Sequence, residues 1–386
     1  MSNNPGEKIP LLRDERFWRV ALQALAVAIF VALIIWLAIN FSRSQQGGRI
    51  NFGFLGKAAS FGIGEGLVSY NPSDPYRQAL LVGLVNSLRI TVLGIILTTI
   101  VGVAAGIASF SENWLLRQLN RVYVEVARNT PLLLQLFFWY FAVFFNLPSQ
   151  ANRIEWLDSI YLSKSGVAMP WPENQLTVWL WLIVLVIGAI AAVFLWRWRT
   201  KLMVEKGTSG SPQLMGLIAI AVAALLIIIF ALGWQVPKPA ETGEIIGGAN
   251  LTLEFSALLA GLVFYTGAFI AEIVRGGIQA VAKGQWEAAR SLGLKSGLVM
   301  RLVIFPQALR VILPALSSQY MNLAKNSSLA VAIGFPDLYS VANTTYNQTG
   351  RPVEVFILIM ATYLSINLII SLAMNYLNKS VEIEER

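Results

Sequence analysis

The stretch that decides the fold is Val355–Leu377, VFILIMATYLSINLIISLAMNYL, in which none of the 23 residues is charged. A helix needs about 20 consecutive, mostly apolar residues to cross the hydrocarbon core of a bilayer. This stretch is long enough, and it therefore predicts a transmembrane helix.

Seven further stretches have the same apolar character, and two of them contain one charged residue each. Leu88–Phe110 contains Arg89, and Val311–Phe335 contains Lys325. The sequence thus predicts an all-α integral membrane protein with about eight transmembrane helices. The gaps between spans are all shorter than about 50 residues, the size at which independent domains start, so no soluble catalytic domain is expected. The other five spans are Val20–Phe41, Pro131–Leu147, Leu176–Trp196, Leu214–Trp234 and Phe255–Ala271.

The composition of the whole chain excludes several kinds of chemistry. Charged residues make up 13% of the 386 residues, about half the share that is usual in soluble proteins. The chain has no Cys and no His, which excludes disulfides, thiolate nucleophiles, zinc fingers and His general bases. The net charge of +8 on a 56% hydrophobic chain indicates a membrane protein rather than a nucleic-acid-binding one. The phosphate-binding motif GxxxxGK[ST] does not occur, so any ATP that powers this protein would bind a separate chain.

The distribution of Lys and Arg predicts the orientation of the spans. If the N-terminus is cytoplasmic, the inside segments hold 19 Lys and Arg and the outside gaps hold 8, and such an excess marks cytoplasmic loops. Both termini are therefore predicted to be cytoplasmic. The first span lacks a following cleavage site, so we expect it to stay as an anchor. The expected divisions are 1–41 for the N-terminus and first anchor helix, 42–80 for an extracytoplasmic loop, 81–378 for the transmembrane region, and 379–386 for a cytoplasmic tail.

Two glycine patterns have ordinary structural interpretations. Gly62-x-Gly64-x-Gly66 does not match the dinucleotide motif GxGxxG, and we expect a turn-rich outer loop packed on the helices. Gly102-x-x-x-Gly106 matches the small-residue motif of closely packed transmembrane helices.

The largest cytoplasmic loop, 272–310, carries the strongest functional signal. Gln285–Leu292 is predicted to be a short helix with Trp286, Ala289 and Leu292 on one face, and Gly293 is predicted to end it. From the residues alone, this helix either lies on lipid headgroups or offers a surface that a partner approaches closely. The preceding Gly276-Gly277 is expected to end the sixth span, and Lys283-Gly284 to form a turn.

The segment EAARSLGLKSGLVMRLVIFP, residues 287–306, resembles the EAA loop of ATP-binding-cassette importer permeases. That pattern is Glu-Ala-Ala, three residues, Gly, nine residues, and Ile-x-Leu-Pro. This chain keeps the spacing, with Val303 for Ile and Phe305 for Leu. Stretches beginning at Asn86, Arg128, Tyr265 and Leu323 are similar to the polar amino-acid uptake branch, which includes histidine, glutamine and glutamate permeases.

The resemblance covers roughly residues 80–378, except the fourth and fifth spans. It implies a MetI-like permease core with an inserted helix pair at about 176–234. The additional first span, the insertion and the long first outer loop resemble the general L-amino-acid permease subfamily.

The resemblance also implies a function and partners. It implies a non-enzymatic permease subunit that moves L-amino acids across the bacterial cytoplasmic (inner) membrane. A dimer of ATPase subunits would bind ATP and Mg, an extracytoplasmic binding protein would deliver the substrate, and a second, non-identical permease subunit would complete the pore. No cofactor is expected in this chain, and lipid surrounds it. The implied coupling loop, about 276–306, docks on the ATPase through Glu287, Ala288, Ala289, Gly293 and Pro306.

Polar side chains inside spans mark a candidate substrate pathway, because polar groups in a bilayer are costly and are therefore kept for function. Lys325 either meets a substrate carboxylate, pairs with Glu125 or Glu272, or extends to the interface. Arg128 is either a pathway residue or a cytoplasmic anchor, and Pro314 is expected to kink the seventh span. The seventh-span candidates are Asn322, Lys325, Asn326, Ser327 and Ser328, and the third-span candidates are Arg128, Thr130 and Gln135.

Two other functions remain open from the residues. An ion-coupled secondary carrier would need titratable groups in the middle of the membrane, and this chain has few. A membrane-embedded transferase would need paired acids at an interface, and none occur at a useful spacing.

Overall fold

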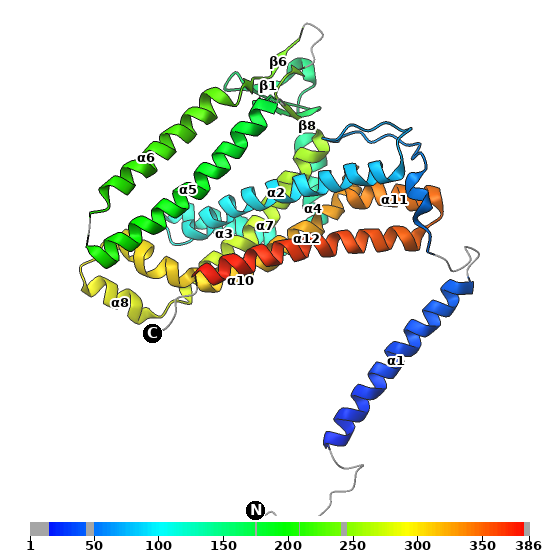
Figure 1. The fold of residues 1–386 in the computed structure, drawn as a ribbon, viewed down its shortest axis with the longest axis horizontal. Helices are drawn as coiled ribbons and strands as arrows, with labels where there is room; N and C mark the ends of the chain where they lie inside the picture. The colour runs from blue at the N-terminus through cyan, green and yellow to red at the C-terminus, as the bar shows by residue number, and fades with distance from the viewer. Residues whose placement is uncertain (1–14, 44–49, 174–175, 208, 241–244, 382–386) are drawn as a thin grey trace, which may run out of the picture.

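The computed structural model describes residues 15–43, 50–173, 176–207, 209–240 and 245–381, and helices dominate it (Figure 1). Seven described helices are long and apolar enough to cross a membrane. They confirm the all-α membrane class. Their segments are α1 (Glu15–Arg43), α2 (Tyr76–Ala108), α5 (Leu176–Lys206), α6 (Ser211–Leu226) with η5 (Ile227–Ala231), α7 (Leu253–Gln279), the stretch Ser296–Ile333 that contains α10 (Phe305–Asn326) and η7 (Ser327–Ile333), and α12 (Pro352–Val381).

The predicted third span differs from the observed structure. Its apolar helix runs only from Leu132 to Phe144, as α4 (Leu132–Phe137) followed by the π-helix η3 (Phe138–Phe144). The segment before it, expected to be a cytoplasmic connection, forms α3 (Trp114–Asn129). Pro131 explains the break between them, because proline cannot donate the backbone hydrogen bond that would continue α3.

The centre of the bundle is α7, which packs against α2 on one side and α10 on another. Gly102 and Gly106 of α2 lie against Ile270 and Val274 of α7, with no room for a Cβ at either glycine. The predicted small-residue motif is therefore an internal helix contact. α12 covers α10, and α11 (Leu338–Thr349) covers the outer part of α2.

The two glycines expected to end the sixth span lie inside α7 instead. The helix continues to Gln279. Gly277 is buried, and a side chain there would collide with Ile312 of α10. Gly277 thus permits close helix packing rather than a helix end, and this prediction was wrong. The predicted turn at Lys283-Gly284 was also wrong, because both residues begin the next helix, α8 (Lys283–Ser291).

An unpredicted antiparallel sheet lies at the outer end of the bundle, with strand order β1-β2-β3-β8. β3 precedes the α5–α6 pair and β8 follows it, and their pairing joins Val167 to Leu251 and Met169 to Ala249. The inserted helix pair therefore leaves and rejoins the core at adjacent strands. The strands are β1 (Ile154–Trp156), β2 (Ile160–Ser163), β3 (Gly166–Met169) and β8 (Ala249–Leu251), with the ribbons β4 (Trp171–Pro172) to β5 (Trp234–Gln235) and β6 (Lys238–Pro239) to β7 (Ile245–Ile246).

The remaining short elements connect these helices. η2 (Phe52–Gly56) lies in the outer loop, and η4 (Gln150–Asn152) precedes β1. α9 (Ser296–Val299) and the π-helix η6 (Met300–Ile304) link α8 to α10. The end of α12 lies at the same end of the bundle as α8 (Figure 1), as expected for a cytoplasmic C-terminus. The predicted tail lies mostly outside the described residues.

Candidate functional site

The cytoplasmic loop forms the short helix α8 at the end of the bundle. Gly293 adopts φ +74° directly after it. The amide of Leu294 donates to the carbonyl of Ala289, and the amide of Gly293 donates to that of Arg290. These two bonds are the Schellman arrangement, in which glycine supplies the left-handed residue that ends a helix. The predicted helix end at Gly293 is confirmed.

The two adjacent alanines of α8 face opposite environments. Ala288 is exposed, whereas Ala289 is only 3% exposed. Ala289 packs in an apolar cluster with Val281, Val299 and Ile304 of the same chain, and Trp286 lies against this cluster. Ala289 therefore packs inside the permease, and of the two alanines predicted to contact a partner only Ala288 is exposed.

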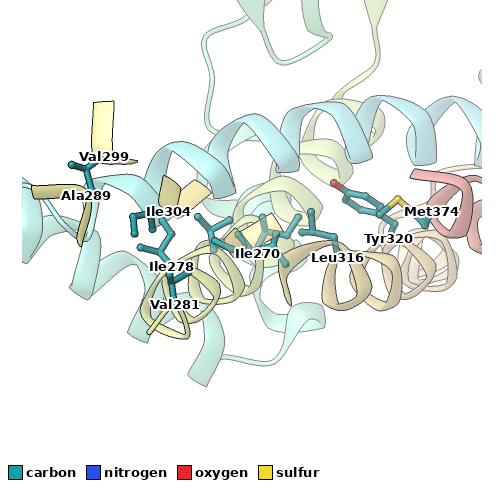
Figure 2. Packing of buried hydrophobic residues seen from close by; sticks show 12 residues of the cluster. Ile270, Ile278, Val281, Ala289, Val299, Ile304, Leu316, Tyr320 and Met374 are labelled. Atoms are coloured by element: carbon teal, nitrogen blue, oxygen red, sulfur yellow. The ribbon is translucent and has the colours of Figure 1, made fainter. Parts of the chain in front are cut away.

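The apolar cluster continues from α8 into the transmembrane bundle. Figure 2 shows Ala289 and Val299 at one end, Ile278 and Ile270 in the middle, and Tyr320 at the other end. We call this continuous set the inner column. Since packed interiors transmit displacement, a movement of α8 reaches α7 and α10 directly through the inner column.

The outward face of α8 was incompletely predicted. Glu287 is exposed, as expected. Leu292, which helical spacing placed with Trp286 and Ala289 on one face, is instead 80% exposed. Leu292 is the cap of the helix, and the apolar cluster that buries Ala289 does not extend to it. Pro306 is half-buried in the first turn of α10, where proline is tolerated.

The seventh-span candidates divide between two surfaces. Asn322 and Lys325 are exposed, and Asn326 and Ser328 are partly exposed. Ser327 is fully buried and its hydroxyl donates to the Ala324 carbonyl at 2.8 Å. The pathway role of all these residues stays a prediction, but the exposed side of the helix carries Lys325 and excludes Ser327.

The third-span candidates meet at the corner between α3 and α4. The buried Gln135 amide donates to the carbonyls of Ala127 at 2.7 Å and Thr130 at 3.0 Å. Thr130 donates to the Val126 carbonyl. The bond to Ala127 satisfies the carbonyl that an amide at position 131 would have bonded and that Pro131 leaves free. All three bonds stabilise the corner. Arg128 points instead toward Glu272 of α7, with 3.7 Å between its guanidinium and the carboxylate.

Glu272, one of the two predicted ion-pair partners of Lys325, pairs with arginines instead. Its carboxylate accepts from Arg275 at 3.0 Å and lies near Arg128. Among the residues that the structure describes, Lys325 forms no ion pair, either with Glu272 or with Glu125.

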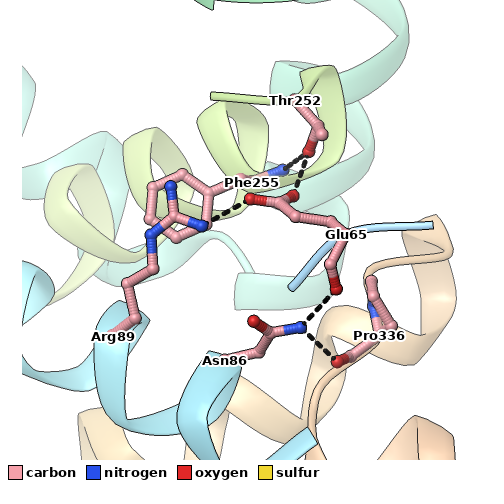
Figure 3. A network of polar contacts seen from close by, with 6 residues as sticks. All are labelled: Glu65, Asn86, Arg89, Thr252, Phe255 and Pro336. Carbon is pink, nitrogen blue, oxygen red and sulfur yellow. Dashed lines mark hydrogen bonds and ion pairs between the residues drawn. The ribbon is translucent and has the colours of Figure 1, made fainter. Parts of the chain in front are cut away.

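A polar network that the sequence analysis missed lies at the outer end (Figure 3). Arg89 pairs with Glu65 of the outer loop at 2.6 Å, and its guanidinium lies 4.0 Å from the Phe255 ring centre. The other Glu65 oxygen accepts from Thr252, which caps α7. The single charge in the second span was the available signal, because a charge there requires a partner.

Asn86 extends this network to a fourth segment. Its amide donates to the backbone carbonyls of Glu65 at 2.8 Å and Pro336 at 3.0 Å. The outer loop is therefore tied to α2, α7 and the segment before α11. The prediction of a loop packed on the helices is confirmed, with Glu65 as its central residue.

The chain is similar to several known proteins. Residues 213–383 match the family described as binding-protein-dependent transport system inner membrane component. The chain is 42% identical to the putative amino-acid ABC transporter permease protein YhdX of Escherichia coli, with 94% of each chain covered. It is 40% identical to the general L-amino acid transport system permease protein AapQ of Rhizobium johnstonii, covering 97% of this chain and 94% of that one. A solved amino acid ABC transporter with histidines is 24% identical over 79% of this chain and 95% of that one, with a TM-score of 0.47.

Proposed function

This chain belongs to the binding-protein-dependent inner membrane permeases and is a permease subunit of an amino-acid ATP-binding-cassette importer; from this premise we propose how it couples and what it carries. α8 docks on a separate ATPase subunit through its exposed face. The observation that carries this proposal is the division between the exposed Ala288 and the buried Ala289.

The docking face consists of the exposed residues Glu287, Ala288, Arg290, Ser291 and Leu292. Leu292 offers an apolar side chain, Ala288 allows close approach, and Glu287 adds a charge for orientation. The opposite side of α8 rests on the inner column, which leads to α7 and α10. ATP and Mg bind the ATPase, and its closure moves α8 and hence the transmembrane helices. Allosteric coupling of this kind requires contacts that differ between two states.

Adjacent alanines provide the test of docking. The tagged chain is purified in mild detergent from its native membrane, and co-purifying proteins are identified by mass spectrometry. Ala288→Asp should abolish co-purification of the P-loop ATPase and leave the thermal stability of the permease unchanged. Ala289→Asp should lower that stability, because it buries a carboxylate in the inner column.

The matched control is Ala151→Asp, which changes another exposed alanine, at the outer end. It should retain the ATPase. If Ala288→Asp also retains the ATPase in stoichiometric amount, α8 does not dock through this face.

For the substrate, we propose L-amino acids of broad side-chain class, as the names of the similar permeases suggest. The carboxylate of the substrate interacts with Lys325. Support comes from its exposed position beside Asn322 and from the absence of an ion pair to Lys325 in the described chain. A second, non-identical permease subunit covers this side of α10, an extracytoplasmic binding protein delivers the substrate, and the assembly lies in the bacterial inner membrane.

Substitution at Lys325 tests the pathway. In proteoliposomes with the binding protein, Lys325→Met should reduce uptake of labelled amino acid at least tenfold, which corresponds to about 1.4 kcal/mol. Lys325→Arg should retain much of the uptake. ATP hydrolysis measured in the same samples shows whether the assembly is intact. Normal uptake by Lys325→Met would exclude the contact between Lys325 and the substrate carboxylate. Separately, mass spectrometry of the purified complex would identify the second permease.

A further inference from the structure

The inner end of α7 has a polar side opposite the inner column. Ile270, Val274 and Ile278 face the column. Glu272 and Arg275 lie on the other side and line a cavity of about 460 Å³. The rest of its wall comes from α3 and from the end of α2. Neither the docking of α8 nor the Lys325 pathway uses this cavity.

The cavity has an excess of positive charge. Four guanidinium groups line it, from Arg117, Arg121, Arg128 and Arg275, against the two carboxylates of Glu125 and Glu272. Among the described residues, Glu272 is the one carboxylate that pairs with them, through Arg275 and Arg128. Two positive charges therefore remain uncompensated within one concave surface.

The opposite face of α3 places this cavity at the membrane boundary. Leu115, Leu119 and Val122 are 56%, 60% and 51% exposed on that face, while Arg117, Arg121 and Arg128 line the cavity. Basic residues opposite an exposed apolar face are typical of a helix that meets the headgroup region. The guanidinium groups that line the cavity lie beside residues 271–279 of α7, at and beyond the inner end of the predicted sixth span, which is the level of the lipid phosphates.

We propose that this cavity binds an oxyanion, the phosphate of an anionic phospholipid or the carboxylates of a cytosolic acidic amino acid. Arginine binds both groups through paired, charge-assisted hydrogen bonds. Arg275 lies two turns before α8 along the chain, and its neighbours on α7 belong to the inner column. A bound oxyanion holds the inner end of α7 against α3, and so stabilises one position of the helix that leads to the docking face.

The test uses the purified transporter complex in lipid nanodiscs. Arg121→Gln removes one cavity charge, and Arg121→Lys keeps it. Arg197→Gln is the matched control, because Arg197 is an exposed basic residue at the inner end of α5 and does not line the cavity. The readouts are the unfolding midpoint in phosphatidylglycerol against phosphatidylcholine, and the lipid retained in native mass spectrometry. A parallel series in detergent adds L-glutamate.

We expect phosphatidylglycerol to raise the midpoint of the wild type, and Arg121→Gln to retain about tenfold less of this lipid, as loss of one charge-assisted bond predicts. Arg197→Gln and Arg121→Lys should behave like the wild type. The same pattern with L-glutamate alone would assign the cavity to the amino acid. No dependence on either anion, or an equal loss in Arg197→Gln, would overturn the proposal.

Discussion

The contact between α2 and α7 allows a prediction whose size follows from the structure. A Cβ added at Gly102 would lie 2.5 Å from the Cβ of Ile270, and one added at Gly106 would lie 2.6 Å from that of Val274. Carbon atoms in contact are about 3.5–4.0 Å apart. The two helices would therefore have to separate by roughly 1 Å to accept either side chain.

Gly102→Ala and Gly106→Ala should each lower the free energy of unfolding by about 1–3 kcal/mol, the usual cost of overpacking. Amino-acid uptake should fall with it, because α7 also carries part of the inner column. The double variant should lose less than the sum, since one separation of the helices relieves both collisions. Denaturant titration in detergent micelles measures the free energy, and uptake into proteoliposomes measures function.

Gly276→Ala is the control within the same helix. A Cβ at this exposed position meets no atom within 4 Å, and alanine favours a helix by about 1 kcal/mol over glycine. Its stability should equal or exceed that of the wild type. If Gly102→Ala and Gly106→Ala behave like Gly276→Ala, close packing of α2 on α7 does not stabilise the bundle and the reasoning fails.

Two further predictions concern buried acids. Burial raises the pKa of the Asp337 carboxyl from 3.8 to about 6, so its stabilisation is complete below pH 3.8 and is lost as the pH rises through 6. Between about pH 7.5 and 5 the unfolding free energy should rise by about 1 kcal/mol, whereas Asp337→Asn, which can still cap α11, should show no such rise; an identical rise would assign it to other groups. Glu65→Ala leaves Arg89, whose side chain is only 15% exposed, without its carboxylate partner, and should lower the free energy of unfolding by up to about 3 kcal/mol. Faster trypsin cleavage in the outer loop would reveal this loss, and the cleavage rate of Glu65→Gln should lie between those of Glu65→Ala and the wild type.

The local sequence predicted the positions of most apolar helices, but it predicted their ends less well. Hydropathy located the apolar segments because every transmembrane helix must satisfy the same length and polarity conditions. It misplaced the end of the sixth span, because Gly277 serves a contact with Ile312 that no local pattern contains. It also missed the sheet, whose strands β3 and β8 are separated in sequence by the whole α5–α6 pair.

At the candidate site, too, local features were predicted and contacts with remote residues were not. The loop pattern located α8, and Gly293 ended it as expected, because the left-handed residue is a local requirement. The burial of Ala289 was not predicted, because Val281, Val299 and Ile304 cover it from other parts of the loop. Helical spacing placed Leu292 on one face with Trp286 and Ala289, but Leu292 is 80% exposed because no remote segment covers it.

The sequence by itself determined the membrane class, the positions of the apolar spans and the coupling-loop motif, since each depends on residues close together in the chain. Only the tertiary structure decided which alanine faces outward, that Glu65 is the partner of Arg89, and that Arg121 and Arg275 line one cavity. The physical reason is distance along the chain. Burial and charge pairing depend on which side chains from remote segments come together, and neither hydropathy nor periodicity contains that information.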